Sequence, residues 1–263
     1  MQVMEVSMAK AVKRTAVIEE KVVLAEGIIS MWLKQEEITK NAKAGQFVSV
    51  YCNDKSRILP RPISLCEIDK ENGRIRLVYR IAGEGTKELS EMNVGENVEI
   101  MGPLGNGFTK EGSKAILIGG GIGIPPMLEL GKELNCDVTF VLGYRDATNF
   151  LADEMKKYGK VVISTEDGSV GTKGNVIDAI KENELSADII YACGPTPMLR
   201  GVKQYASEQC IKAQISLEER MACGVGACLA CVCKSKEIDH HSQVNNKRVC
   251  KDGPVFYAEE VEL

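Results

Sequence analysis

The stretch AILIGGGIGIPP, residues 115–126, decides the fold of this chain. Residues 115–118 form a short apolar run that predicts a buried strand, and a helical pattern follows at about 126–134. Glycines between the two let backbone N–H groups approach a pyrophosphate, and a helix start adds favourable partial charge. Strand, glycine-rich turn and helix in this order predict a dinucleotide-binding turn, and a tight structural turn is the alternative. Its candidate cofactor-binding residues are Gly119, Gly121 and Gly123.

Strands and helices continue to alternate after this turn. The later apolar runs are residues 138–142, 161–163 and 188–192, and the later helical patterns lie near 149–158, near 175–181 and from about 197. Such alternation predicts an α/β domain, a doubly wound parallel sheet with helices on both faces. We expect this nucleotide-binding domain to span residues 109–212.

The second apolar run of this domain ends in Gly143-Tyr144-Arg145-Asp146. Asp146 follows Gly121 at about the distance where an acid binds the ribose of NAD. Arg145 would instead suit the 2′-phosphate of NADP. We slightly favour a plain surface Arg–Asp turn over a binding role for either residue, and between the two nucleotides the sequence points to NAD.

Short strand-like runs precede the glycine-rich turn. Residues 45–51 alternate only in part, whereas residues 73–79 and 96–100 alternate between apolar and polar side chains. Period-two alternation predicts half-buried strands, and several of them with Gly and Pro between predict a small antiparallel barrel. The turn-rich segment 102–107 ends this region, which we expect to cover residues 1–108.

Several residues of the predicted barrel have the chemistry to bind a flavin. Arg61 and Arg80 could neutralise a diphosphate, and the glycine-rich helix start at residues 83–86 is a candidate anion site. Ser64 could hydrogen-bond a ring nitrogen of the flavin, and Tyr79 could stack on the cofactor or line it. Taken singly, each of these is more often an ordinary barrel residue.

Half of the ten cysteines lie beyond residue 222. Cys223, Cys228 and Cys231 have C-x4-C-x2-C spacing and Cys250 follows, which is the plant-type [2Fe–2S] ligand pattern. Small residues between them let backbone N–H groups reach the sulfurs and tune the reduction potential. Zinc is the second reading, although zinc ribbons usually pair two C-x2-C knuckles, and inert buried thiols are the third. Cys233 forms a C-x-C pattern with Cys231 and could replace it as a ligand, but we do not expect Cys233 to be a ligand.

Composition narrows the function classes. Hydrophobic residues make up 44% and charged residues 27%, as in an ordinary globular protein, and the net charge of −4 argues against nucleic acid or an anionic membrane as a partner. The only two histidines, His240 and His241, are adjacent in a polar stretch expected to be a solvated loop. A Ser-His-Asp hydrolase is therefore improbable. Without an apolar stretch of signal-peptide or membrane-spanning length, we expect a cytoplasmic protein with reduced cysteines.

The motifs together resemble the ferredoxin-reductase superfamily. They are R-P-I-S at 61–64, G-E-G-T at 83–86, the glycine-rich turn, and Cys193-Gly194-Pro195 with Met198. The cysteine-rich pattern followed by V-C-K-D-G-P-V-F at 249–256 is similar to electron-transfer subunits of the NAD-dependent, two-subunit dihydroorotate dehydrogenases. The segment up to about Lys10 and the polar insert between Cys231 and Cys250 look less standard for that family.

This resemblance implies a set of cofactors and a partner. It implies FAD at Arg61, Pro62, Ile63, Ser64, Val78, Tyr79, Arg80, Gly85 and Thr86. It implies one [2Fe–2S] cluster on Cys223, Cys228, Cys231 and Cys250, in a third module over residues 213–263. Cys193 would lie near the nicotinamide of NAD, with a buried strand-end thiol as the alternative. The implied partner is an FMN-containing dihydroorotate dehydrogenase catalytic subunit in a two-plus-two heterotetramer.

The implied activity is electron transfer for pyrimidine biosynthesis. Dihydroorotate would be oxidised at the partner's FMN, and electrons would pass through the cluster and FAD to NAD. One rival is a related subunit of a ferredoxin:NADP or sulfide/polysulfide oxidoreductase. A rival of another class is a zinc-bearing, nucleotide-binding regulatory module, which would be colourless.

Overall fold

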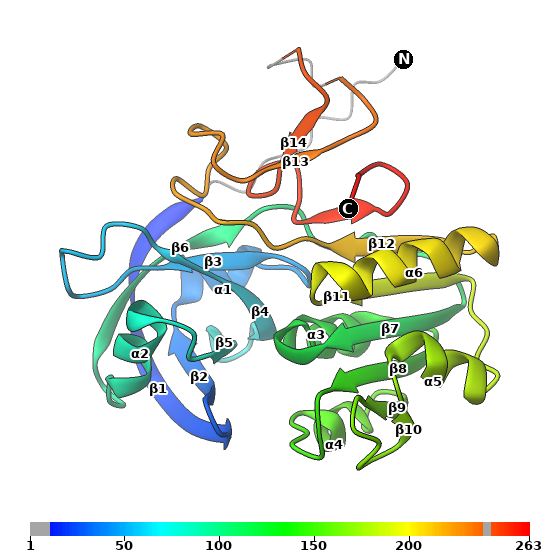
Figure 1. Cartoon of the computed structure of the whole chain (residues 1–263). Coiled ribbons are helices and arrows are strands. Elements are labelled where there is room, and N and C mark those ends of the chain that lie inside the picture. Colours follow the sequence, from blue (N-terminus) through cyan, green and yellow to red (C-terminus); the bar gives the residue numbers. More distant parts are fainter. Residues whose placement is uncertain (1–10, 239–242) are drawn as a thin grey trace.

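The computed structural model describes residues 11–238 and 243–263, and the first part of them forms a closed barrel (Figure 1). Its strands are β1 (Val12–Ala25), β2 (Ile28–Lys34), β3 (Phe47–Val50), β4 (Arg61–Asp69), β5 (Arg74–Arg80) and β6 (Asn97–Leu104). They pair antiparallel in the order β1-β2-β5-β4-β3-β6, and β6 closes onto β1. Two helices accompany the barrel, α1 (Glu36–Asn41) and α2 (Glu84–Glu91). The predicted antiparallel barrel is thus confirmed.

The second part is a seven-stranded sheet in the order β10-β9-β8-β7-β11-β12-β15. Its strands are β7 (Lys114–Gly120), β8 (Asp137–Tyr144), β9 (Lys160–Thr165), β10 (Thr172–Lys173), β11 (Ile189–Cys193), β12 (Lys212–Ser216) and β15 (Val255–Tyr257). All neighbours are parallel except β15, which runs antiparallel to β12. The doubly wound parallel sheet is confirmed, and the antiparallel edge strand is an addition that the sequence did not predict.

Helices cover both faces of this sheet, as predicted. Helices α3 (Pro125–Glu133) and α4 (Ala152–Met155) pack on one face, and α5 (Val176–Glu182) and α6 (Thr196–Glu208) pack on the other. The strands contribute apolar side chains to the core on both faces of the sheet, because successive side chains alternate between the faces. On β7, Leu117 packs with the α3 side and Ile118 with the α5 and α6 side.

One predicted helix is much shorter than its pattern. The sequence predicts a helix near 149–158, but α4 spans only Ala152–Met155. Leu151 just before it has φ of +65°, which is not a helical conformation. Gly159 just after it lies so close to β8 that a Cβ there would be 2.3 Å from the carbonyl oxygen of Val138. Packing at both ends therefore leaves room for about one turn.

A cysteine-rich module lies between β12 and β15 and rests on both domains (Figure 1). It contains the hairpin of β13 (Val232–Lys234) and β14 (Asn246–Arg248). Its Cys231 and Cys250 belong to the same apolar cluster as Phe47 of the barrel and Phe256 of β15. The predictions for His240, His241 and the segment up to Lys10 fall outside the described residues. In the described part of the chain, no helix is long and apolar enough to cross a membrane.

Buried charges join the barrel to the sheet domain. Arg76 of β5 is only 7% exposed, and its guanidinium donates to Glu67 of β4 at 2.7 Å and to Glu154 of α4 at 2.6 Å. Beside it, Glu129 of α3 accepts a hydrogen bond from the backbone N–H of Ile68 at 2.8 Å. Removing one partner would leave a buried charge uncompensated, which is costly. This junction therefore holds the two domains in one relative orientation.

Candidate functional site

The glycine-rich turn meets the Cys193-Gly194-Pro195 turn at the carboxyl ends of adjacent strands β7 and β11. The chain proceeds from β7 toward β8 on one side and returns to β11 on the other, which makes this the topological switch point of the sheet. A Cβ at Gly123 would lie 2.3 Å from the carbonyl oxygen of Cys193, so the two turns touch through backbone. Ligands of open α/β sheets bind at such a switch point. The predicted residues Gly119, Gly121, Gly123 and Cys193 are thus brought together.

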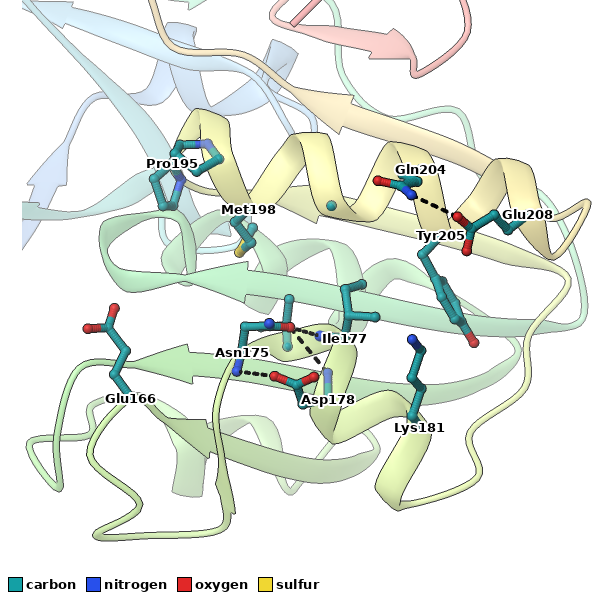
Figure 2. A pocket seen from close by; sticks show the side chains of 13 residues that line it. Glu166, Asn175, Ile177, Asp178, Lys181, Pro195, Met198, Gln204, Tyr205 and Glu208 are labelled. Atoms are coloured by element: carbon teal, nitrogen blue, oxygen red, sulfur yellow. Dashed lines mark hydrogen bonds between the residues drawn. The ribbon is translucent and has the colours of Figure 1, made fainter.

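A groove of about 660 Å³ continues from this point between α5 and α6 (Figure 2). Pro195 and Met198 line it where α6 begins, and Asn175 lines it where α5 begins. Glu166, which follows β9, lies beside this same end of the groove. The groove therefore offers an elongated ligand a path from the two turns across the helix starts.

The acid at this groove is not Asp146, which the sequence offers as a candidate ribose acid. Asp146 is exposed, does not line the groove, and accepts a hydrogen bond from the backbone N–H of Thr148 at 2.8 Å. It therefore lies in a surface turn, which is the interpretation that the sequence slightly favours. Glu166 lies in the groove instead. The signal that would have found it is its place directly after the third strand of the sheet, where β9 ends at Thr165.

The predicted flavin residues gather at one end of the barrel, where β4 begins and β5 ends. The guanidinium of Arg61 lies directly on the first turn of α2. A Cβ at Gly85 would be 1.9 Å from Arg61 Nε, so glycine is what makes this contact possible. Thr86 Oγ1 accepts a hydrogen bond from the backbone N–H of Ala82 at 2.9 Å and holds the helix start in place. An arginine against a helix start forms a cradle that fits a diphosphate.

The other flavin residues divide between the outside and the inside of the barrel. Ser64 is half-buried, and Val78 packs toward the sheet domain. Arg80 extends to the glycine-rich turn, where a Cβ at Gly121 would be 3.5 Å from its Nη2. By contrast, Ile63 and Tyr79 pack in the barrel core, so a Tyr79 ring stacked on a cofactor outside the barrel does not fit. Burial raises the pKa of Tyr79, and its hydroxyl has no hydrogen-bond partner among the described residues.

The four predicted cluster cysteines come together as two pairs. The backbone N–H of Cys228 donates to Cys223 Sγ at 3.4 Å, and the backbone N–H of Cys250 donates to Cys231 Sγ at 3.4 Å. The N–H of Gly226 donates to Cys250 Sγ at 3.1 Å and so links the pairs. Two irons that share four thiolates take two each, which fits this arrangement. Zinc ribbons usually pair two C-x2-C knuckles, and the cysteine loop has only one, Cys228 with Cys231.

Backbone donors prepare the outer cysteine of the loop for metal binding. Desolvation alone would raise the pKa of Cys223, but N–H donors from Val225, Cys228 and Ala227 outweigh it and lower the pKa to about 6. Cys250 is buried, and burial together with the neighbouring Cys231 raises its pKa to about 12. Thiolate is the form that binds iron. The pKa of the outer cysteine, Cys223, thus favours the thiolate, whereas the pKa of the buried Cys250 favours the thiol.

At two other cysteines the effect of burial on the thiol exceeds that of the hydrogen bonds. Cys233 is buried in β13, and burial raises the pKa of its thiol to about 11. Burial likewise raises the pKa of Cys193 to about 12, although a hydrogen bond with Ser216 acts against it. Cys193 ends β11 and lies at the switch point, next to Gly119 of β7.

Comparison with known proteins covers all three parts of the chain. Residues 15–108 match the oxidoreductase FAD-binding domain, and residues 117–204 match the oxidoreductase NAD-binding domain. Residues 218–262 match the iron-sulfur cluster binding domain of dihydroorotate dehydrogenase B. The chain therefore has FAD-binding, NAD-binding and iron–sulfur domains in the predicted order.

Relatives extend over almost the whole length. The electron transfer subunit of dihydroorotate dehydrogenase B (NAD(+)) from Fusobacterium nucleatum is 44% identical over 94% of this chain and 97% of its own length. The subunit of the same name from Listeria monocytogenes is 46% identical over 86% of this chain and 90% of its own.

Solved structures share the fold. A chain from the structure of an NADH-dependent reduced ferredoxin-NADP oxidoreductase is 31% identical, with a TM-score of 0.84 over 94% of this chain and 89% of that one. A ferredoxin reductase of carbazole 1,9a-dioxygenase shares the fold at 19% identity, with a TM-score of 0.66 over 76% of this chain and 67% of that one. The subunits from Fusobacterium nucleatum and Listeria monocytogenes are 44% and 46% identical to this chain over most of its length. The chain therefore belongs to the family of dihydroorotate dehydrogenase B (NAD(+)) electron transfer subunits.

Proposed function

We propose that the chain passes electrons from an FMN-containing dihydroorotate dehydrogenase catalytic subunit through a [2Fe–2S] cluster and FAD to NAD+. The observation that carries this proposal is the order of the three sites in space. The cysteine loop rests on β3 at Gly224, and β4 beside β3 carries Arg61 and Ser64. Arg80 then extends from the flavin end of the barrel to Gly121. The proposed sites for cluster, flavin and nicotinamide thus form one continuous series.

Each part of the chain has a defined task in this proposal. Bound FAD supplies the conversion between single electrons and the electron pair that nicotinamide carries. Arg61 and the start of α2 would hold its diphosphate, and Ser64 on the outside of β4 would hydrogen-bond its ring. Cys223, Cys228, Cys231 and Cys250 would hold the cluster. The proposed limits of the three modules are 1–108, 109–212 and 213–263, and the last of these joins the sheet through β12 and β15.

The catalytic subunit would dock over the cysteine loop. Val225 is 47% exposed and Leu229 is 46% exposed, and Cys228 between them is exposed as well. Apolar side chains that surround an exposed ligand are a suitable contact for a partner that delivers electrons. We propose a two-plus-two heterotetramer in the cytoplasm, in line with the name of the relatives as subunits and with ten unpaired cysteines in this chain.

Glu166 is expected to select NADH over NADPH. Its carboxylate at the groove would accept hydrogen bonds from a ribose diol and repel a 2′-phosphate. In Glu166→Arg we expect kcat/KM for NADH to fall about tenfold and kcat/KM for NADPH to rise about tenfold, since one charge contact is worth about 1.4 kcal/mol. The assay is reduction of ferricyanide by either nucleotide. Glu208→Gln, at the other end of the same groove, should change neither value, and an unaltered preference in Glu166→Arg would contradict this assignment.

The proposed function is tested by the partner that accompanies the native protein. The subunit that co-purifies under anaerobic conditions is identified by mass spectrometry, and the complex is assayed for dihydroorotate-dependent NAD+ reduction. We expect an FMN-containing dihydroorotate dehydrogenase and coupled activity in the complex. Recovery of a larger iron–sulfur flavoprotein instead, with no dihydroorotate oxidation, would favour the second candidate. That candidate is a subunit of a ferredoxin-NADP oxidoreductase, which the 31% identical structure supports.

A further inference from the structure

Ser49 is a polar residue between the proposed flavin strand and the cysteine loop. It lies on β3, whose neighbouring residues Val48 and Val50 point into the barrel core. Because side chains alternate along a strand, Ser49 points out of the barrel. On that outer face its cross-strand neighbours are Pro62 of β4 and Met101 of β6.

The hydroxyl of Ser49 is fully buried and unsatisfied. Its side chain has an exposure of 0%, and among the described residues no group accepts from or donates to Oγ. Leaving a buried hydroxyl without a hydrogen bond is unfavourable, and such groups in native proteins normally have a partner. The surroundings of Ser49 therefore indicate what its partner is.

The cysteine loop covers this hydroxyl. A Cβ at Gly224 would lie 3.2 Å from Ser49 Oγ, 3.2 Å from Met101 Cε and 3.3 Å from Leu104 Cδ1. Gly224 has φ of +69° and directly follows the proposed ligand Cys223. A side chain at Gly224 would hold the loop away from the barrel, so glycine brings the loop backbone down onto Ser49.

We propose that Ser49 is a positioning residue for electron transfer. Its hydroxyl makes no hydrogen bond to Cys223 in the described structure, but it would donate one to the Cys223 sulfur when the cluster is bound, because Gly224 next to that cysteine lies directly on Ser49. This inference rests on the proposed [2Fe–2S] site. The bond would stabilise the reduced, more negative cluster more than the oxidised one, because hydrogen bonds to sulfur tune the reduction potential. Ser49 would thereby match the cluster to the flavin on the adjacent strand.

The test is Ser49→Ala in the cofactor-loaded complex, with cluster and flavin potentials measured by redox titration. EPR reports on the cluster and visible absorbance on FAD. We expect iron and FAD content to be unchanged and the reduction equilibrium of the cluster to shift about tenfold toward the oxidised form, which is 59 mV lower for one electron. We also expect loss of one exchangeable-proton coupling in ENDOR spectra recorded in H2O and D2O. The flavin potential should not move.

Ser164→Ala is the matched control, because Ser164 Oγ is also buried and unpartnered but lies on β9 in the sheet domain. It should leave the cluster potential and the ENDOR coupling intact. If the cluster potential does not move in Ser49→Ala, or if the flavin potential shifts instead, the proposed role of Ser49 is wrong. The proposed cluster is not affected by that result. An unaltered protein that binds iron but gives no [2Fe–2S] EPR signal after reduction by one electron would overturn the proposed cluster itself.

Discussion

Replacement of Cys250 by serine should reduce dihydroorotate-dependent NAD+ reduction more than about 100-fold, because even residues behind metal ligands account for 10–100-fold effects. Cys250 is the inner member of the Cys231 pair and is 2% exposed. FAD binding and oxidation of NADH by ferricyanide should persist, since both depend on the other two domains. Iron content, the EPR signal and the two activities are measured on the same preparation.

Cys233→Ser is the control for this prediction. Cys233 lies two residues from Cys231 and is buried like Cys250, but it takes no part in the hydrogen bonds that join Cys223 with Cys228 and Cys231 with Cys250. We expect the variant to keep both iron and coupled activity. If Cys233→Ser loses the cluster and Cys250→Ser retains it, the fourth ligand is Cys233 and the proposed pairing is wrong.

Replacement of Arg61 by methionine should weaken FAD binding about 100-fold, since two charge-assisted hydrogen bonds to a phosphate are worth about 3 kcal/mol together. Arg61 is the cation that rests on the start of α2, and methionine keeps much of its length without its charge. The measurement is FAD content after gel filtration, with the dissociation constant from the fluorescence of released flavin. NADH oxidation should fall in proportion to FAD and recover at high added FAD.

Two further variants separate the role of Arg61 from general damage to the barrel. Gly85→Ala should weaken FAD binding as well, because its Cβ would occupy the position of Arg61 Nε. Arg74→Met removes an arginine of the same barrel that pairs with Asp69 and stacks on Trp32, far along β5 from Arg80. It should retain full FAD content. Equal loss in Arg74→Met would show that the effect of Arg61 is structural.

Local patterns were sufficient to predict most of the fold. The glycine-rich turn and the alternating runs depend on neighbours in sequence, so the barrel, the parallel sheet and most of its helices follow from them. Strands β12 and β15 were not predicted, because each is short and becomes a strand by pairing with a distant partner: β12 with β11, and β15 with β12. The helix near 149–158 was predicted too long, since the close approach of Gly159 to Val138 is a tertiary contact.

In the candidate site, too, the residues set by local sequence could be predicted, and those set by tertiary contacts could not. Cysteine spacing alone predicts a four-thiolate loop, because three of the four lie within nine residues from Cys223 to Cys231. Glu166 and Ser49 could not be found in this way. Glu166 depends on which strand end borders the groove, and Ser49 depends on a loop that arrives from much later in the chain. The direction of Tyr79 also depends on barrel register, which places its ring inside.

The pairing of β12 with β15 makes the cysteine-rich module an insertion, anchored at both ends in adjacent strands of the sheet. The ends of the segment are thus brought together before any metal arrives, and much of the entropic cost of closing it is met by the sheet. Small metal domains that lack such an anchor unfold without their ion. In this chain, assembly of iron and sulfide would instead take place on a preformed scaffold, late in maturation. A cell short of iron would accumulate a folded flavoprotein that is ready for repair and not an unfolded chain for degradation.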